Sequence, residues 1–198
     1  MTHYRRLSPL FSQASFALLL ILLTVASALT ATRVSTVPGV SIENFGKIDD
    51  HYYRGSQPNA KQFAELKRLG IKTVIDLRKD FKPEAENWAK ESGLQYFRIP
   101  LKPGTPATTE QTSYFLSLVN DPANWPVYVH CKGGRHRTGA LTAVYRITHD
   151  GWTADQAYNE MKEYDFNSGF FGGGPEAQKK FVYSFYENYR ATTTAGQK

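Results

Sequence analysis

Cysteine is almost absent from this chain: its 198 residues contain only one, Cys131. One cysteine cannot form a disulfide within the chain, so a hydrophobic core has to stabilise the fold. The sequence also lacks an internal repeat and the G-x-x-x-x-G-K-[ST] motif of nucleotide-binding loops. The excess of positive charge is small, at +6, and no basic stretch is interleaved with aromatic residues. We therefore expect no nucleic-acid partner.

Histidine is scarce as well, with five in the chain. His51 and His149 belong to no pattern of spaced metal ligands, so we predict no zinc site and no cofactor. The hydrophobic content of 41% is ordinary for a globular protein. About 170 residues remain once an N-terminal leader is set aside, which is enough for one domain with a full core.

The N-terminus is basic and then apolar. Residues 1–10 contain two arginines and no acid, and an apolar segment of about 18 residues follows at 14–31. The small residues A-S-A ending at Ala28 fit a cleavage site, so residues 1–31 are a signal peptide or, if uncleaved, a membrane anchor. Because the positive charges precede the apolar segment, either version exports the rest of the chain to the periplasm or another extracytoplasmic space.

The rest of the chain alternates between strand-like and helix-like segments, after a polar, irregular lead-in at 32–50 and before a flexible tail at 191–198. Short segments rich in β-branched and aromatic residues predict strands at 51–55, 71–77, 94–101 and 125–130. Amphipathic spacing and capping residues predict helices at 59–69, 83–92, 109–120, 137–150, 153–164 and 175–189. This alternation is typical of βαβ units. The predicted domain, residues 51–190, is therefore α/β with a mainly parallel central sheet flanked by helices.

The sole cysteine lies in a glycine-rich, basic segment, VHCKGGRHRTG (residues 129–139), between a predicted strand and a predicted helix. In an open parallel sheet, ligands bind beyond the carboxyl ends of the strands, where this turn must lie. Gly133, Gly134 and Gly139 permit tight or left-handed backbone conformations. The backbone N–H groups of such a turn, at a helix N-terminus, form a binding site for an anion.

Cys131 and Arg137 are spaced as C-x5-R, which allows the loop to curl around one phosphate group. We expect the Cys131 thiolate to lie under the phosphorus while the Arg137 guanidinium binds two of the phosphate oxygens. The amides, the helix dipole and nearby cations favour the thiolate and lower the cysteine pKa, which yields a nucleophile without a metal. The neighbouring Thr138 hydroxyl is suited to stabilise the thiolate as a leaving group.

The segment HCKGGRHRTG resembles the H-C-x5-R-[ST]-G signature of the cysteine-dependent protein tyrosine and dual-specificity phosphatases. Three further segments are similar to the bacterial, plant and fungal atypical dual-specificity branch, namely YYRGSQP (52–58), LGIKTVIDLR (69–78) and GWTADQAYNEMKEYDF (151–166). The resemblance implies a cysteine phosphatase-like fold. It also implies hydrolysis of phosphate monoesters through a phosphocysteine intermediate.

The resemblance implies roles for other residues of the loop. Lys132, Arg135 and His136 match a basic loop of the branch that acts on inositol polyphosphates, and they would bind substrate together with the glycine amides. The alternative is that these side chains only face solvent. His130 and Gly139 match positions that organise the loop, and a role of His130 as a base is the alternative. The implied substrate is a phosphorylated protein, an inositol phosphate or a phosphoinositide.

Two arginines outside the loop also fall in matching segments. Arg54 lies in YYRGSQP and Arg78 ends LGIKTVIDLR. The resemblance implies that both line the pocket, while ion pairs elsewhere in the fold are the alternative.

One part of the family pattern is missing. The resemblance implies an aspartate general acid on the loop after the strand LQYFRIPL, but Lys102 occupies that place and residues 102–109 contain no carboxylate. Asp76 and Asp80, which follow the neighbouring strand, and Glu110 are the remaining candidates. Asp76 is equally suited to a structural role as a hydrogen-bond acceptor, and Glu110 to the first turn of a helix.

Two other functions stay open at this point. Without the usual aspartate, the chain can be a phosphate-binding pseudophosphatase with weak or no turnover. A rhodanese-type sulfurtransferase also uses a single loop cysteine, but the Arg137-Thr138-Gly139 sequence and the lack of a duplicated domain argue against it. Turnover of an aryl phosphate separates the phosphatase from the first alternative, and a persulfide assay separates it from the second.

The N-terminal pattern predicts that the domain lies outside the cytoplasm. When the full chain is expressed in bacteria and protease is added to spheroplasts, we expect the domain to be degraded, because export leaves it exposed. A cytoplasmic marker protein should survive the same treatment. A domain that stays protected until the spheroplasts are lysed would overturn the prediction.

Overall fold

The structure is a computed structural model that describes residues 37–80, 82–166 and 174–195. The predicted signal peptide or anchor, residues 1–31, lies outside the described residues, as does the end of the tail at 196–198. In the described part of the chain, no helix has both the length and the apolar character needed to cross a membrane.

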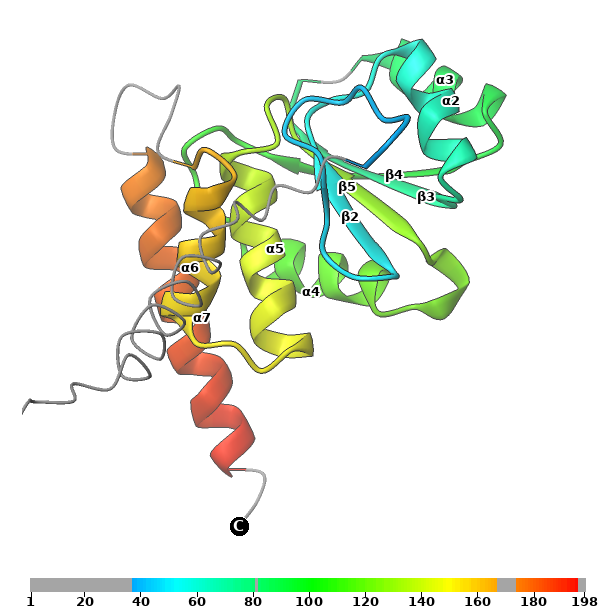
Figure 1. Ribbon diagram of the computed structural model, residues 1–198. Helices are drawn as coiled ribbons and strands as arrows, with labels where there is room; N and C mark the ends of the chain where they lie inside the picture. The colour runs from blue at the N-terminus through cyan, green and yellow to red at the C-terminus, as the bar shows by residue number, and fades with distance from the viewer. Residues whose placement is uncertain (1–36, 81, 167–173, 196–198) are drawn as a thin grey trace, which may run out of the picture. The chain divides into compact units, whose positions relative to one another are not determined.

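A five-stranded sheet forms the centre of the domain (Figure 1). Its strands, in chain order, are β1 (Gly46–Lys47), β2 (Tyr52–Gly55), β3 (Thr73–Arg78), β4 (Gln95–Leu101) and β5 (Val127–His130). Across the sheet the order is β1-β2-β5-β3-β4, with β1 antiparallel to β2 and all other neighbours parallel. The prediction of an α/β fold with a mainly parallel sheet is therefore confirmed.

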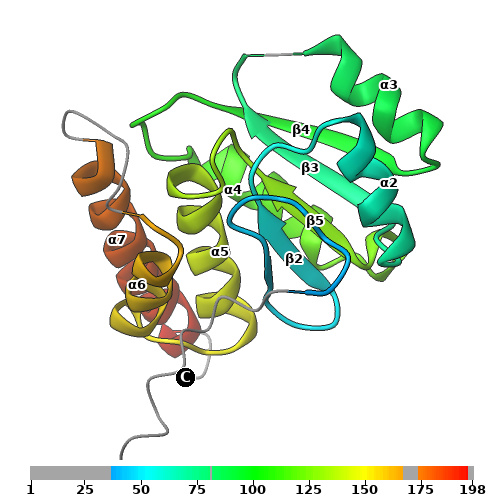
Figure 2. The same ribbon diagram turned by 45° about the horizontal axis from the view of Figure 1, so that its top comes forward.

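Helices cover both faces of the sheet, as Figures 1 and 2 show. They are α2 (Ala60–Arg68), α3 (Pro83–Glu91), α4 (Thr109–Val119), α5 (His136–His149), α6 (Ala154–Glu163) and α7 (Gly174–Ala195), with a short 3-10 helix at Pro122–Asn124. Each predicted helix is present, and most of its bounds differ by a residue because capping residues were counted as helical. Asn59, Thr108 and Thr153 cap their helices with a side-chain oxygen rather than joining them.

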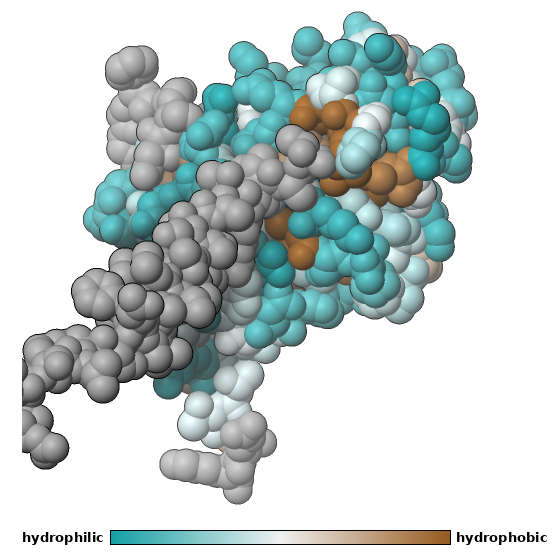
Figure 3. All heavy atoms as spheres, in the orientation of Figure 1, coloured by the Kyte–Doolittle hydropathy of each residue, from teal (hydrophilic) through white to brown (hydrophobic). Residues whose placement is uncertain are grey.

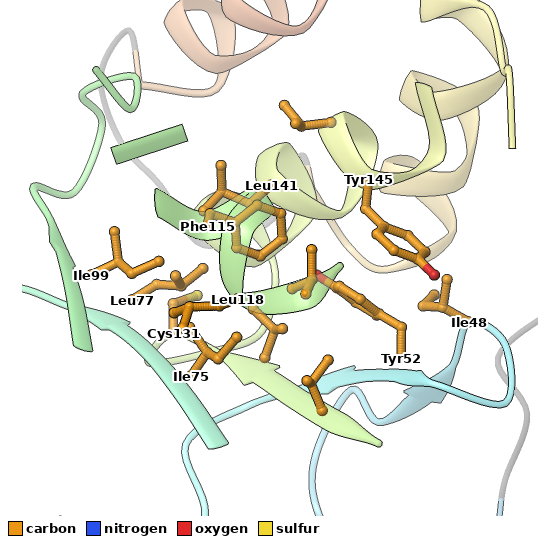
Figure 4. Close-up of a cluster of buried hydrophobic side chains, with 14 of the residues drawn as sticks. Ile48, Tyr52, Ile75, Leu77, Ile99, Phe115, Leu118, Cys131, Leu141 and Tyr145 are labelled. Atoms are coloured by element: carbon orange, nitrogen blue, oxygen red, sulfur yellow. The ribbon is translucent and has the colours of Figure 1, made fainter. Parts of the chain in front are cut away.

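Two hydrophobic cores lie on opposite faces of the sheet, because successive side chains of a strand point to opposite sides. On β3, Val74 packs with the α2 and α3 side chains Phe63 and Ala85. Its neighbour Ile75 packs with α4 and α5 side chains, among them Phe115 (Figure 4). A third cluster joins α5 to α6 and α7. With these residues buried, the described surface seen in Figure 3 is mainly hydrophilic.

The structure differs from the sequence-based boundaries at both ends of the domain. The segment 37–50, expected as an irregular lead-in, forms β1 and places Ile42, Phe45 and Ile48 in the two cores. At the other end, α7 continues to Ala195, so residues 191–195 are helical rather than part of a flexible tail. The two alanines of this stretch and Arg190 just before it favour helix, and threonine hydroxyls there donate to carbonyls one turn earlier.

The parallel strands end at one edge of the sheet and bring five residues together there. Gly55 of β2 is paired with His130 of β5, and Arg78 of β3 with Leu101 of β4. Asp76 of β3 is also paired with His130. The loops that follow these strands therefore meet at the carboxyl edge, where ligands bind in open parallel sheets.

Candidate active site

The segment that follows β5 forms a tight loop that enters α5 at the carboxyl edge of the sheet. Residues 131–135 make the turn, and α5 begins at His136. Arg135, at the N-cap, makes no side-chain hydrogen bond to the first turn of α5. The first N–H groups of α5 therefore carry no side-chain cap and remain suited to an anion.

Three successive carbonyl groups of this loop are held from outside. The N–H of Gln57 donates to the Lys132 carbonyl at 3.2 Å, and the Asn44 side chain donates to the Gly133 carbonyl at 3.5 Å. A guanidinium nitrogen of Arg54 donates to the Gly134 carbonyl at 2.5 Å. Because these carbonyls point away from the loop, the intervening N–H groups turn toward its interior, which is the arrangement of an anion-binding nest.

Gly134 is the one loop glycine whose conformation requires glycine. Its φ is +68°, and a Cβ at this position would lie 2.4 Å from the backbone carbon of Gly55. Gly133 and Gly139 differ from the prediction, because neither has a positive φ and a Cβ on either would meet only ordinary contacts at 3.5 Å or more. Gly139 lies within α5 against Met161, so its place is in helix packing.

Cys131 lies at the base of the loop, 3% exposed, beside the β3 side chains Ile75 and Leu77 (Figure 4). Burial by itself raises the pKa of a thiol, because it disfavours the charged form. Here the Arg137 charge, the Thr138 hydroxyl, and the backbone N–H groups of Thr138 and Gly134 outweigh burial and lower the pKa of Cys131. The predicted thiolate is therefore favoured by groups of the loop itself.

Arg137 reaches across the ends of two strands. One of its terminal nitrogens, Nη1, donates to the carbonyl of Leu101 at 3.2 Å and approaches that of Leu77 at 3.5 Å. Within the described part of the chain, its Nε and Nη2 atoms make no hydrogen bond, although the residue is only 7% exposed. The guanidinium is thus anchored at one corner, which leaves the two-nitrogen edge suited to a phosphate.

His130 lies beneath the loop in a fully buried position. Its Nδ1 is 3.2 Å from the Cys131 carbonyl oxygen, to which it donates, and 3.9 Å from Asp76. Burial lowers the pKa of His130, so the imidazole is neutral at pH 7. A buried, neutral ring bound to the loop backbone fits the organising role better than that of a base facing a substrate.

The surroundings of Asp76 do not suit a general acid. It is fully buried and accepts hydrogen bonds from the Tyr96 hydroxyl at 2.7 Å and from the Arg78 backbone and side chain at 2.8 and 3.2 Å. Burial alone would raise the pKa of Asp76, but His130, Arg78 and Tyr96 outweigh it and lower the pKa. An ionised carboxylate with its oxygens occupied has no proton to donate. The structure thus favours the alternative, a structural hydrogen-bond acceptor.

The two arginines outside the loop are both fully buried. Arg78 forms an ion pair with Asp76 and donates to the Gln57 side chain at 2.6 Å. Arg54 has no carboxylate partner among the described residues, and its guanidinium lies 3.9 Å from the centre of the Tyr164 ring. Neither arginine lines the two described cavities over the loop, and their contacts hold Gly134 and the residues around the loop.

Two adjoining cavities open over the loop. One, of about 420 Å³, is lined by Cys131 with Arg137, by Lys132, Gly133, Arg135 and His136 of the loop, and by Glu43, Pro103 and Gly104. The other, of about 520 Å³, is lined by Lys79, Asp80, Pro103, Lys132 and Arg137. The predicted nucleophile and its arginine therefore share a cavity with the basic loop residues, as the sequence analysis expected of a phosphate site.

The basic side chains differ in how they face these cavities. Lys132 is exposed and lines both of them. Arg135 is engaged in ion pairs, to Glu43 at 2.8 Å and to Asp165 at 3.8 Å. The His136 ring lies against Phe166, and burial lowers the pKa of this histidine, so it adds no charge at neutral pH. Lys132 is thus the loop cation best placed for a substrate.

The remaining candidates for the general acid separate clearly. Asp80 lines the second cavity with Arg137, and its side chain is 66% exposed. Glu110 lines neither cavity, and a hydrogen bond from Thr108 lowers its pKa, as befits a carboxylate in the first turn of a helix. Among the carboxylates named from the sequence, only Asp80 lines a cavity with Arg137, and it lies 3.8 Å from the buried Arg78 guanidinium.

Residues 43 and 44 contribute to the site although no motif in the sequence indicates it. Glu43 lines the cavity of Cys131, and Asn44 binds the loop carbonyl at Gly133. Both belong to the segment that was treated as a lead-in. The signal that could have found them is the spacing of the apolar residues Ile42, Phe45 and Ile48, which indicates a buried segment. No group of three or more potential metal ligands occurs in the described residues.

A family model described as a DSP-PTPase phosphatase fused to NAD+ kinase matches residues 36–181, most of the chain. The chain belongs to this DSP-PTPase phosphatase family. The matched region begins at residue 36, which agrees with the inclusion of residues 37–50 in the domain.

The chain is also similar to individual phosphatases. The dual specificity protein phosphatase TpbA of Pseudomonas aeruginosa is 32% identical over 123 residues, which cover 62% of this chain and 55% of TpbA. The inositol diphosphatase DSP4 of Arabidopsis thaliana is 29% identical over 126 residues, covering 61% and 63%. The crystal structure of TpbA superposes with a TM-score of 0.62 at 27% identity and covers 78% of this chain and 98% of that one. This chain thus spans about half the length of TpbA as a curated sequence.

The lowered pKa of Cys131 predicts an unusually reactive thiol. Because the chain has one cysteine, alkylation by iodoacetamide reports on Cys131 alone in the unfolded as in the folded protein. The rate follows the thiolate, so its pH profile should have a midpoint below the value of about 8.5 for a free cysteine. Arg137→Met removes the largest favourable charge and should move the midpoint upward.

Arg68→Met, which removes an exposed arginine of α2, is the matched control and should leave the midpoint in place. A wild-type midpoint at or above that of free cysteine would contradict the assignment of a stabilised thiolate.

The position of Asp80 predicts that the effect of its replacement on kcat/KM depends on the leaving group of the substrate. Asp80→Asn should reduce kcat/KM roughly 10²-fold for an alkyl phosphate but little for an aryl phosphate with an acidic phenol, which departs without a proton. Glu110→Gln should behave like the wild type with both substrates, and Asp76→Asn should lower both rates together. If Asp80→Asn also behaves like the wild type, the proton comes from water or from the substrate itself.

Proposed function

We propose that this protein is a cysteine-dependent phosphatase that hydrolyses phosphate monoesters through a phosphocysteine intermediate. The observation that carries the proposal is the placement of Cys131, with a lowered pKa, in one cavity with Arg137 and beneath inward-facing loop amides. Membership of the DSP-PTPase family and the similarity to TpbA and DSP4 support the same chemistry.

In the first step the Cys131 thiolate attacks phosphorus, and the bond from phosphorus to the leaving oxygen breaks with its electron pair. The leaving oxygen takes a proton, for which Asp80 is the best-placed donor. The free edge of Arg137 and the loop amides bind the three other phosphate oxygens, on which negative charge is spread in the transition state.

In the second step water attacks the phosphocysteine and gives one proton to Asp80, which lost its own in the first step. The phosphorus–sulfur bond breaks, and inorganic phosphate leaves. The sulfur departs as a thiolate, which the Thr138 hydroxyl and the backbone amides stabilise. The reaction needs no metal, because the arginine and the amides supply the positive charge that a metal would otherwise provide.

For the substrate we propose a phosphorylated protein or an inositol phosphate. TpbA is named a dual specificity protein phosphatase and DSP4 an inositol diphosphatase, and both are of comparable similarity to this chain. A cavity of about 420 Å³ at the loop, joined to a second one lined by Lys79 and Lys132, supports phosphate esters with further anionic groups. A phosphoinositide in a membrane is the third substrate class that we propose, because it carries phosphate monoesters on an inositol ring.

A phosphate-binding pseudophosphatase is the second candidate function. It is favoured by one observation, that the loop of residues 102–109 contributes Pro103 and Gly104 but no carboxylate to the cavity. The two functions predict the same phosphate binding and differ only in turnover.

The covalent mechanism predicts that the nucleophile and the phosphate clamp have separable roles. Cys131→Ser should lower 4-nitrophenyl phosphate hydrolysis by roughly 10³-fold or more and retain phosphate binding, because the amides stay in place. Arg137→Lys should lose roughly 10²-fold, since an ammonium group cannot replace a two-nitrogen edge. Arg68→Lys on α2 is the control and should match the wild type.

Hydrolysis by Cys131→Ser at a rate near that of the wild type would exclude the phosphocysteine mechanism. Phosphate binding by a wild-type protein that shows no turnover of 4-nitrophenyl phosphate would establish the pseudophosphatase instead.

A further inference from the structure

The mouth of the Cys131 cavity carries an ion pair that the mechanism does not use. The Nη2 atom of Arg135 is 2.8 Å from a carboxylate oxygen of Glu43, and its Nε is 3.8 Å from Asp165. Both Arg135 and Glu43 line the cavity. Arg135, one of the loop cations that line the cavity, is therefore already bound to carboxylates of the protein.

The position of Glu43 is fixed by the residues around it. Ile42 and Phe45 are 5% and 6% exposed, and the Glu43 carbonyl accepts a hydrogen bond from the N–H of Ser56 at 3.0 Å. Asn44 is tied to the carbonyls of Gly133 and Tyr164. The backbone at Glu43 is thus attached to the loop, so its carboxylate stays at the cavity mouth although its side chain is 67% exposed.

Lys132, from the same loop, provides a contrast. Its side chain is exposed, it lines both cavities, and it forms no ion pair with a described residue. The positive charge around the cavity is consequently uneven. The charge of Arg135 is offset by carboxylates, whereas the charge of Lys132 is available to a ligand. A second phosphate next to the reacting one is repelled by Glu43 on the Arg135 side and attracted by Lys132 on the other.

We propose that Glu43 is a specificity-determining residue, which holds Arg135 and lowers the affinity of the site for substrates with a second phosphate adjacent to the reacting one. The inference rests on the proposed function, because it assumes that the reacting phosphate occupies the loop above Cys131. Glu43 acts on the neighbouring group and takes no part in the transfer itself.

Inorganic phosphate and pyrophosphate are the probes that test this proposal, since pyrophosphate adds one phosphate directly beside the first. Their dissociation constants are measured by calorimetry on Cys131→Ser and on Cys131→Ser combined with Glu43→Gln, so that no turnover is needed. The ratio of the two constants cancels changes that affect both anions alike. We expect Glu43→Gln to shift the ratio roughly three- to tenfold in favour of pyrophosphate, and less at high salt.

Two control variants separate the effect of the Glu43 charge from that of changing the side chain and from that of removing a carboxylate elsewhere. Glu43→Asp keeps the carboxylate and should keep the ratio close to that of the Cys131→Ser parent. Asp50→Asn removes an exposed carboxylate that precedes β2, at the opposite edge of the sheet, and should leave the ratio unchanged.

Phosphate binding with a ratio that Glu43→Gln does not move would overturn the inference and leave the proposed function intact. Failure of both anions to bind to Cys131→Ser would overturn both. A third result would also contradict the inference: if Glu43→Gln in the active enzyme slows an alkyl phosphate but not an aryl phosphate with an acidic phenol, then Glu43 is the proton donor.

Discussion

The hydrogen bond from Arg54 to the Gly134 carbonyl is the contact on which the site depends. The guanidinium comes from β2, is fully buried, and holds a carbonyl that would otherwise be free to turn into the loop. A carbonyl facing the phosphate position would repel an anion, whereas an N–H attracts it. The YYRGSQP segment thus shapes the Cys131 loop from outside, through Arg54, the close approach of Gly55 and the N–H of Gln57.

The same edge of the sheet concentrates buried positive charge. Arg54, Arg78 and Arg137 are all buried, and among the described residues only Arg78 has a buried carboxylate partner, Asp76. A buried charge without a counter-ion is costly, and carbonyl and aromatic contacts offset only part of that cost. An anion bound over Cys131 supplies negative charge near these buried arginines. The site is therefore arranged for a phosphate dianion even though the net charge of the chain is modest.

Much of this arrangement could be predicted from the sequence. The residue patterns identified four of the five strands and each α-helix of the described residues, although not the short 3-10 helix, and the C-x5-R spacing placed Cys131 and Arg137 in one cavity. Local spacing identifies such features because the residues involved are neighbours in the chain. β1 was missed because a two-residue strand leaves no periodic pattern.

Contacts between distant segments could not be predicted in this way. Whether Asp76 donates a proton or holds Arg78 depends on Tyr96, which lies twenty residues away, and the sequence left both possibilities open. Glu43 was overlooked because its partner Arg135 is 92 residues further along the chain. The role of Gly139 was misjudged for a similar reason, since helix packing against Met161 is invisible in the loop motif.

The isolation of Cys131 has a consequence for oxidative damage. A thiolate that attacks phosphorus also reacts with peroxide, and the resulting sulfenic acid is usually protected by condensing with a second thiol. No second cysteine exists among these 198 residues, so the chain cannot store the oxidised state as an internal disulfide. Reduction by a thiol then needs one from solution, and that thiol has to reach Cys131 through the cavity that Glu43 and Pro103 help to line.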